Sequence, residues 1–422
     1  MKKYRSRIAD RILLDKLEAK GAVLIEGAKW CGKTTTAIQV AKSSIFIQDP
    51  AKRNQYQKMA ELDPSLLLEG ETPRLIDEWQ LAPQLWDAVR YEVDRRDEFN
   101  QFILTGSSVP ILDWSTSHTG TGRISRMVMR PMSLFESGDS TGSISLTDLF
   151  SKKKDITAKS LIDIRQAAYL ICRGGWPKAL DQTEKIALRQ ARDYYDAIVE
   201  SDISAVDGIY RNPQRVKLLM RSFSRFIASD AKIPGIRSDM ITNDTDSLDE
   251  DTIYSYITAL KRIFVVEDLP AWSPNLRSKT AIRTSDTRHF VDPSIAAASL
   301  GIGPADLLND LNTMGLLFES MCIRDLRVYT EALDGTVYHY RDKAGLECDA
   351  IIHLRNGSYA LIEVKLGGKE IDDAANNLQR LKSKIDTDRM KAPSFLMILT
   401  GTDFAYQRED GVYVIPIGCL RD

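Results

Sequence analysis

Short apolar runs alternate with longer amphipathic stretches in the first part of the chain. The runs are "AVLIEG" (22–27), "SIFIQD" (44–49), "RLIDEW" (74–79) and "QFILTGSS" (101–108), and residues 7–19 before them have helical spacing. Strand-length runs separated by helix-length segments are typical of a mostly parallel α/β sheet. The pattern therefore predicts such a sheet within residues 1–150.

The pattern changes twice after this block. From about 155 to 272 the periodicity is helical, and a Pro-, Ser- and Arg-rich passage at 269–286 follows. Beyond it, apolar runs alternate again with a helix expected near 370–385: "VYHYRD", "LECDAIIHL", "YALIEVKL", "SFLMILTG" and "VYVIPIG". This alternation predicts a second α/β unit at the C-terminal end.

Composition and charge narrow the possible functions. A chain of 422 residues is too long for one ordinary core, so we expect roughly two to four domains. The net charge of −2 gives no global basic field, so nucleic-acid binding would need a local patch. Five widely separated cysteines argue against a disulfide framework and a zinc site. Without a secretory signal or a long apolar run, we expect a cytoplasmic protein with no membrane partner.

The segment "GAKWCGKT" matches the phosphate-loop pattern at Gly27, Gly32, Lys33 and Thr34. It follows an apolar strand and opens a helix, so backbone N–H groups and a helix N-terminus would face anionic phosphates. Lys33 would neutralise phosphate charge and the Thr34 hydroxyl would bind Mg²⁺. We place Thr35 with the nucleotide-binding residues. The segment predicts ATP and Mg²⁺ as cofactors.

An acidic pair and a hydroxyl pair complete this predicted site. Asp77 ends an apolar run and is suited to hold Mg²⁺, and Glu78 beside it could polarise the attacking water. Thr105 and Ser107 end the next run, where a polar group could sense the γ-phosphate.

The sequence leaves two roles open for a pair of arginines and indicates packing for two residues of the loop. Arg123 and Arg126 could stabilise transition-state charge in cis or from a neighbouring chain, or could form ordinary surface ion pairs. Because the loop contacts phosphate through its backbone, Trp30 and Cys31 are interpreted as packing residues.

Several motifs together resemble a prokaryotic family of AAA-type ATPases. They are "LIEGAKWCGKTT", "LIDEWQLAP", "FILTGSS", "GRISRMVMRPMSLFE", "GGWPKAL", "YSYITALKRIFVVEDLPAW", "GLLFESMCIRDLRVY" and "IEVKLG", which extend over nearly the whole chain. The resemblance implies an AAA-type fold, ATP binding and a C-terminal domain of unsettled function. Trp30 and Cys31 depart mildly from the glycine- or proline-rich loop usual in that family.

A basic stretch lies in the helical middle of the chain, between 211 and 237. Its cations are Arg211, Arg215, Lys217, Arg221, Arg225, Lys232 and Arg237, opposed by Asp230. A helix here, the acidic turn "TNDTDSLDEDT", a second helix and an apolar strand are the outline of a winged helix, and the resemblance implies the same module. The stretch could bind DNA or RNA through phosphates, contact a protein, or be a solvated face.

The segment "ECDAIIHLRNGSYALIEVK" (347–365) fits the core of PD-(D/E)xK nucleases. On a strand Glu363 and Lys365 share one face, and Asp349 on the paired strand could approach them. The carboxylates would hold Mg²⁺ and Lys365 would position the nucleophile. Upstream, Glu319 could add another acid, and Glu347 is a further candidate. The alternative is a salt-bridged pair on a degenerate scaffold.

These predictions divide the chain into four parts. They are a P-loop AAA-type domain (1–150), a helical lid (151–212), a winged-helix-like domain (213–275) and a nuclease-like α/β domain (285–422). Three hypotheses follow: an ATP-regulated nucleic-acid enzyme, a regulatory ATPase whose C-terminal domain is an inactive partner-binding scaffold, and a nucleic-acid-binding module controlled by ATP. An oligomer is compatible with each.

Overall fold

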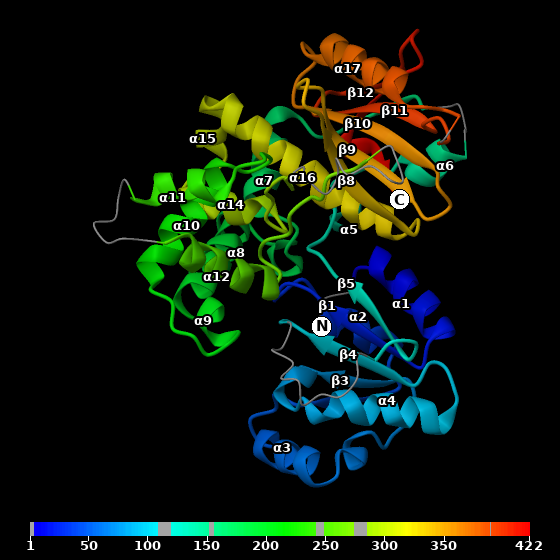
Figure 1. Ribbon diagram of the computed structural model, residues 1–422, viewed down its shortest axis with the longest axis vertical. Helices are drawn as coiled ribbons and strands as arrows, with labels where there is room; N and C mark the ends of the chain where they lie inside the picture. Colours follow the sequence, from blue (N-terminus) through cyan, green and yellow to red (C-terminus); the bar gives the residue numbers. More distant parts are fainter. Residues whose placement is uncertain (1–3, 109–119, 152–155, 242–248, 274–284, 389) are drawn as a thin grey trace.

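A parallel sheet forms the core of the first part of the chain. The computed structural model describes residues 4–108, 120–151, 156–241, 249–273, 285–388 and 390–422. Five strands pair in parallel in the order β2–β3–β4–β1–β5 (Figure 1), with bounds β1 Ala22–Glu26, β2 Ser43–Phe46, β3 Arg74–Asp77, β4 Phe102–Gly106 and β5 Ile124–Val128. The predicted mostly parallel α/β sheet is confirmed.

Helices cover both faces of this sheet because the internal strand β1 is apolar on both sides. Leu24 packs with Trp86 of α4, whereas Val23 and Ile25 pack with Leu13 of α1. The helices are α1 Ile8–Ala19, α2 Lys33–Val40, α3 Arg53–Leu62 and α4 Gln84–Arg96, with short 3-10 turns at Pro64–Leu67 and Trp79–Leu81. Strand β4 lies between β1 and β3, so the carboxyl ends of all three strands meet at one edge.

The C-terminal part contains a mixed sheet of seven strands, in the order β7–β12–β13–β11–β10–β9–β8 (Figure 1). The strands are β7 Ala158–Lys159, β8 Gly335–Arg341, β9 Glu347–Leu354, β10 Tyr359–Lys365, β11 Phe395–Thr400, β12 Phe404–Gln407 and β13 Tyr413–Pro416. Helix α17 (Ile371–Lys384) packs on one face and α16 (Leu311–Glu331) on the other. The second predicted α/β unit is therefore present.

Helices dominate the middle of the chain. They are α7 Ile164–Arg173, α8 Glu184–Ala197, a π-helical turn Ile198–Asp202, α9 Ile203–Ala205, α10 Pro213–Arg225, α11 Ile233–Ile241, α12 Glu250–Arg262, α14 Pro293–Leu300 and α15 Pro304–Asn309, with a 3-10 turn at Pro177–Ala179. After α12, isolated antiparallel bridges at Val266–Phe290 and Leu269–Thr287 take the place of the expected strand. Much of the predicted acidic turn, 242–248, lies outside the described residues.

Two segments near residue 150 belong to the C-terminal part rather than to the units expected from the sequence. Strand β6 (Ile144–Ser145) pairs with β14 (Leu420–Arg421), and β7 forms an edge of the seven-stranded sheet. The short helices α5 Leu134–Ser137 and α6 Leu146–Phe150 flank β6, and a 3-10 turn at Ile417–Cys419 precedes β14. The boundaries expected at 150 and 151 differ from the structure because such short pairings leave little periodic signal.

An ion cluster joins the three parts. The Arg130 guanidinium, just beyond β5, lies 2.6 Å from Glu267 and 2.7 Å from Glu331 at the end of α16. Burial would raise the pKa of Glu267, but the guanidinium groups of Arg130 and Arg327 outweigh it and lower that pKa to about 2. Glu267 is therefore charged in the folded protein well below the ordinary range of a glutamate.

The depressed pKa of Glu267 predicts a pH-dependent stability. Its stabilising charge is fully present above the ordinary pKa of 4.5 and is lost as the pH falls toward 2. We expect Glu267→Gln to be less stable than wild type near pH 5, with the difference shrinking as the pH decreases. Denaturant unfolding between pH 5 and pH 3 measures this. Asp334→Asn, which removes one partner of an exposed pair with Arg355, is the control, and its free energy of unfolding should change with pH as that of wild type does. If the difference in free energy of unfolding between Glu267→Gln and wild type stays constant from pH 5 to pH 3, the assignment is contradicted.

Candidate functional site

The phosphate loop connects β1 to α2, and two of its glycines are required by the backbone. Gly27 has φ 146° and Gly32 has φ 108°, both in the region that favours glycine. A Cβ atom on Gly27 would lie 2.1 Å from the Met129 carbonyl oxygen. The loop is therefore packed tightly against the residue that follows β5, and the N-terminus of α2 opens at its end.

Lys33 is a buried cation without an anionic partner. Its side chain is 6% exposed, and its Nζ donates hydrogen bonds to the carbonyl oxygens of Gly27 (2.9 Å) and Ala28 (2.8 Å). Among the described residues no carboxylate lies within ion-pair distance of it. A buried ammonium is costly without a counter-charge, so the position suits an anionic ligand.

The Asp77 carboxylate at the end of β3 gathers polar groups from three other elements. Its Oδ1 accepts hydrogen bonds from the hydroxyls of Thr34 (2.6 Å) and Thr105 (2.7 Å), and its Oδ2 accepts one from Gln48 (3.0 Å). Asp77 and Thr105 are fully buried. A carboxylate and a hydroxyl are oxygen ligands that Mg²⁺ prefers, so Thr34 and Asp77 fit the predicted metal role.

Glu78 adopts a left-handed conformation, with φ 56°, directly after β3. Its carboxylate accepts hydrogen bonds from the Gln80 amide and from the Ser107 hydroxyl, the latter at 3.2 Å. Its backbone N–H donates to the Thr105 hydroxyl at 3.3 Å. An unusual backbone conformation next to the phosphate loop is typical of a functional position, and it aims Glu78 at the cavity described next.

A cavity of about 1150 Å³ lies in front of the loop. Of the predicted residues, Gly32, Lys33, Thr34, Thr35, Glu78 and Ser107 line it, and Asp77 and Thr105 lie behind them. A neighbouring cavity of about 510 Å³ shares Gly32 and Thr35 and is lined by Tyr4, Met132 and Ile186. Together they offer a cationic region at the loop and a second region of mixed apolar and polar lining beside it.

Helices of the middle of the chain close the larger cavity. These helices and the turn before α8 contribute Asp202 and Lys178 to the lining. Two turns of the first part of the chain contribute Gln48 and Gln80. Sequence analysis had not identified any of these four residues as part of the site. These residues come together only in the folded chain. Gln80 and Lys178 lie in two of the segments that carry the family resemblance, but no role was predicted for either of them.

The two unusual loop residues have different environments. Cys31 is fully buried and its thiol donates to the Met129 carbonyl at 3.2 Å, as expected of a packing residue. Trp30 is 44% exposed and lines the cavity, near the rings of Tyr194 and the ammonium of Lys178. Trp30, which has a left-handed backbone angle, therefore packs against Tyr194 and is also exposed to the cavity, which the packing interpretation did not predict.

The two candidate arginines do not reach this site within the chain. Arg123 precedes β5 at the opposite edge of the sheet, where its carbonyl accepts from Ala22 and its guanidinium pairs with Asp94 at 2.7 Å. Arg126 pairs with Glu26 at 3.2 Å from within β5. A catalytic role for Arg123 in cis is wrong because parallel strands place their start and end at opposite edges; a role in a neighbouring chain stays a prediction.

The structure brings the C-terminal candidates together at the ends of β9 and β10. The Lys365 ammonium lies 2.9 Å from Glu363 and 3.4 Å from Asp349, and Asp349 also accepts from the Val364 N–H at 2.7 Å. The backbone pairing of β9 with β10 ends at Ala350 and Ile362. Beyond that point, the Asp349 carboxylate accepts a hydrogen bond from a backbone N–H group of β10, that of Val364. The predicted proximity of Asp349, Glu363 and Lys365 therefore exists.

Burial and like charge govern the protonation of this group. Burial, reinforced by the Asp349 carboxylate, raises the pKa of Glu363 to about 8. Burial also raises the pKa of Glu319 on α16 well above its ordinary value, with Asp349 adding to the effect. Burial would lower the pKa of Lys365, but Asp349 and Glu363 outweigh it and raise that pKa.

Glu319 does not complete a metal cage with these groups. Within the parts of the chain that the structure describes, no three His, Cys, Asp or Glu side chains are grouped so that they could hold a metal ion. Glu347, the further candidate, is half exposed and pairs with Arg341 at 3.2 Å. The C-terminal group therefore consists of two carboxylates and one ammonium, as the structure places it.

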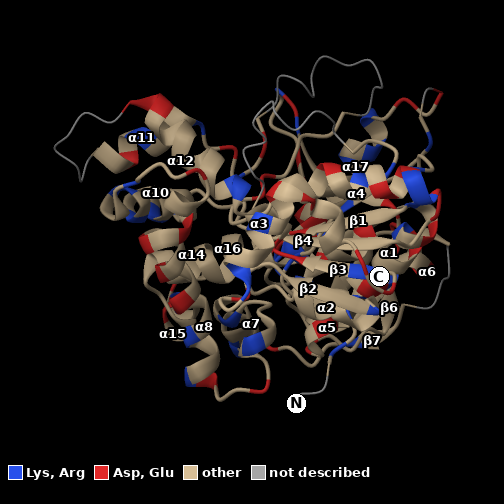
Figure 2. Ribbon diagram, turned by 90° about the horizontal axis from the view of Figure 1, so that it is seen from below, with Lys and Arg blue, Asp and Glu red and all other residues tan. Residues whose placement is uncertain are grey.

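The basic stretch 211–237 is partly neutralised. Arg211 is buried and pairs with Asp207 at 2.7 Å, Lys217 lies 3.4 Å from Glu200, and Arg225 pairs with Asp239. Basic and acidic segments accordingly mix around α10 and α11 (Figure 2). Arg211 is not available to nucleic acid, because burial and its own counter-ion occupy it.

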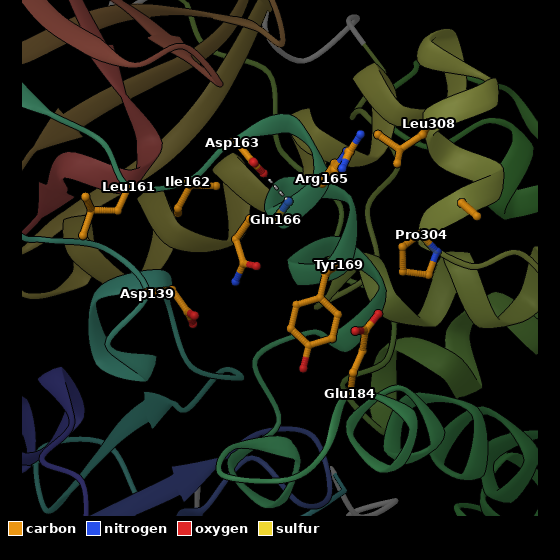
Figure 3. Close-up of a pocket in the computed structure, with 11 residues that line it drawn as sticks. Asp139, Leu161, Ile162, Asp163, Arg165, Gln166, Tyr169, Glu184, Pro304 and Leu308 are labelled. Carbon is orange, nitrogen blue, oxygen red and sulfur yellow. Dashed lines mark hydrogen bonds between the residues drawn. The ribbon is translucent and has the colours of Figure 1, made fainter.

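A separate hollow of about 800 Å³ lies between α7 and α15 (Figure 3). Asp139, Asp163, Tyr169 and Glu184 surround it, and Asp163 caps the start of α7. None of the residues predicted from the sequence lines it.

A buried ion pair braces the phosphate loop from behind. The Arg7 guanidinium lies 3.0 Å from Glu136, and both side chains are almost fully buried. Arg7 also donates to the carbonyl oxygens of Cys31 (2.8 Å) and Arg130 (2.9 Å). Sequence reasoning missed this pair because its two residues are 129 positions apart in the chain, and the segment that ends at Glu136 gave no indication of its partner.

Comparison with protein-family models matches three successive parts of the chain. Residues 19–137 match the family model of an AAA domain, residues 164–306 match a domain of unknown function (DUF8612) and residues 314–420 match another (DUF4143). The first match supports an AAA-type ATPase domain, and with it nucleotide binding at the level of that family. The other two matches assign no activity.

The similar proteins carry little functional information. Two uncharacterized proteins, from Mycobacterium bovis and Mycobacterium tuberculosis, are each 24% identical over 351 residues, which is 81% of this chain and 70% of theirs. A variant of RuvB from Thermotoga maritima is 14% identical and covers 62% of this chain and 88% of its own, with a TM-score of 0.23, too low to support an argument. No helix of the described residues is long and apolar enough to cross a membrane.

The buried brace predicts a large stability cost. Glu136→Gln leaves the Arg7 guanidinium buried without a counter-charge, so we expect the free energy of unfolding to fall by about 3 kcal/mol or more. Urea unfolding of the full chain measures the change. Asp181→Asn, which removes the partner of the exposed Arg5, should cost at most about 1 kcal/mol. If both variants lower the free energy of unfolding equally, burial does not make the Arg7–Glu136 pair more important for stability than an exposed pair.

Proposed function

We propose that the chain binds and hydrolyses ATP at its phosphate loop and transmits the nucleotide state to the C-terminal domain. The observation that carries the proposal is the buried Lys33 ammonium, which has two carbonyl acceptors and no anionic partner among the residues that the structure describes. It lies beside the Thr34–Asp77 pair in a cavity of about 1150 Å³. The match to the AAA domain model supports the same conclusion.

Each residue has a role that follows from its position. Thr34 and Asp77 would hold Mg²⁺, which supplies positive charge beside the phosphates when it is bound. Lys33 would neutralise the phosphate oxygens. Glu78 would orient the attacking water and accept its proton, and Thr105 would hold Asp77 in place. The neighbouring cavity, which Tyr4, Met132 and Ile186 line together with polar side chains, would take the base.

Coupling would run through the segment that follows β5. Gly27 packs against Met129, and the next residue, Arg130, is the centre of the ion cluster with Glu267 and Glu331. A shift of the phosphate loop on nucleotide binding would therefore act on the segment after α12, which carries Glu267, and on the end of α16, which carries Glu331.

The second candidate function is metal-dependent cleavage of nucleic acid in the C-terminal domain. The observation that favours it is the convergence of Asp349, Glu363 and Lys365. Two carboxylates suffice for Mg²⁺, which keeps several waters when bound, and Lys365 would position a nucleophile. The alternative is a partner-binding scaffold in which Lys365 neutralises the buried Glu363 and the partly buried Asp349. Binding of DNA or RNA through 211–237, contacts with protein partners and an arginine from a neighbouring chain of an oligomer stay predictions.

The ATPase proposal predicts two separable defects. Lys33→Ala should abolish ATP binding, because the main cation of the loop is lost. Glu78→Gln should keep ATP binding while hydrolysis falls by about 100-fold or more. Equilibrium binding of a fluorescent ATP analogue and steady-state phosphate release measure these effects. Lys58→Ala, on the exposed face of α3, is the control; tight ATP binding by Lys33→Ala would refute the phosphate-loop assignment.

The nuclease candidate is tested with the full chain, ATP, and Mg²⁺ or Mn²⁺ on DNA and RNA. If wild type cleaves, Asp349→Asn and Lys365→Met should each lose cleavage by about 100-fold or more and keep ATP binding. Glu347→Gln, outside the cluster and paired with Arg341, should cleave normally. If wild type cleaves neither nucleic acid with either metal, the scaffold alternative is favoured.

A further inference from the structure

A second lysine of the phosphate loop reaches across the nucleotide cavity. Lys29 lies two residues after Gly27, and its Nζ is 2.8 Å from the Asp202 carboxylate of the helical middle. The Lys29 side chain is 46% exposed, whereas that of Asp202 is 14% exposed. Both residues line the cavity, so this ion pair links the loop directly to the helices that close the site.

Asp202 stands at an unusual point of the helical middle. It ends the π-helical turn Ile198–Asp202, which joins α8 to α9. The Ser201 hydroxyl donates to the backbone carbonyl of Ala197 and to the Asp202 carboxylate, the latter at 3.4 Å. π-helical turns are rare and occur frequently at functional sites. A turn of this kind can change to regular helix with a small change in hydrogen bonding, which would move Asp202.

The electrostatics of the cavity favour an exchange of partners. A triphosphate carries more negative charge than one carboxylate, so it would compete for the Lys29 ammonium. The same triphosphate would be repelled by Asp202. Within the chain, Arg123 lies at the far edge of the sheet, so it cannot supply a second cation on the phosphate side. Lys29 has both the location and the freedom to do so.

We propose that Lys29 is a second phosphate-binding cation of the ATP site and that Asp202 holds it away until a triphosphate binds. The inference rests on the proposed ATPase function. On ATP binding the ammonium leaves Asp202 for the terminal phosphate, and residues 198–206 lose their link to the phosphate loop. ADP lacks that phosphate and leaves the pair intact. The helical middle thus distinguishes ATP from ADP.

Nucleotide affinity tests the proposal on the full chain with Mg²⁺. We expect Lys29→Met to weaken ATP binding by about ten-fold, the size of one charge-assisted hydrogen bond, and to leave ADP binding unchanged. Asp202→Asn should tighten ATP binding severalfold, because the competing carboxylate is gone. In the Lys29→Met background most of that gain should vanish. Titration with fluorescent ATP and ADP analogues measures both affinities for wild type, the two single variants and the double variant.

A matched control lies in the same π-helical turn. Glu200 pairs with Lys217, which does not line the cavity, so Glu200→Gln should leave both affinities unchanged. Hydrogen exchange gives an independent readout: residues 198–206 should exchange faster with ATP than with ADP in wild type. In Asp202→Asn they should exchange fast without nucleotide.

The possible results are distinct. If Lys29→Met lowers ATP and ADP affinity equally, or not at all, the proposal is refuted. If Asp202→Asn weakens ATP binding, Asp202 supports the structure of the site and does not compete with ATP for Lys29, which refutes the proposal. Wild type that binds ATP normally in these cases leaves the ATPase proposal standing. Wild type that binds neither nucleotide removes both proposals.

Discussion

The pairing of Arg7 with Glu136 is the constraint on which the arrangement of the first site depends. Two opposite charges are buried together, and their remaining hydrogen-bonding capacity is used by the chain around them: Arg7 holds the carbonyls of Cys31 and Arg130, while Glu136 accepts from the N–H groups of Ile8 and Ser133. Such a pair tolerates little displacement, since any separation leaves a charge in a medium of low polarity. The phosphate loop, the start of α1 and the start of α5 are therefore fixed relative to one another.

The same fixed segment leads directly to the C-terminal domain. At the start of α5, the Leu134 N–H donates to Asp325 of α16 at 2.9 Å. Arg324 then connects Asp325 to Asp292, which accepts from the Gly175 N–H. Buried charges paired in this way convert three packed units into one connected body. Helix α16 also carries Glu319, whose pKa the Asp349 carboxylate helps to raise. The two candidate sites are therefore joined through α16 and through the start of α5, which Asp325 binds.

Local patterns predicted the parts of the fold and site that depend on neighbours in sequence. The parallel sheet follows from apolar runs, and Lys33 and Thr34 follow from a motif whose glycines satisfy backbone geometry. Distant pairings were beyond reach: strand β7 has two residues, too few to show periodicity. Asp202 and Gln48 enter the cavity through tertiary packing alone. The exposure of Trp30 to the cavity was not predicted, because residue type does not reveal the left-handed backbone angle at this position.

The two candidate sites differ in how their charges are balanced, and this difference bears on what each can do. At the phosphate loop the described part of the chain offers the buried Lys33 only neutral acceptors, so an anionic ligand would supply the missing counter-charge. In the C-terminal group Lys365 already contacts both Asp349 and Glu363, so charge is largely balanced without a ligand. A cation entering there would have to compete with an ammonium that the protein itself supplies. The first site is built to receive a ligand, whereas the second must give up an internal contact before it can bind one.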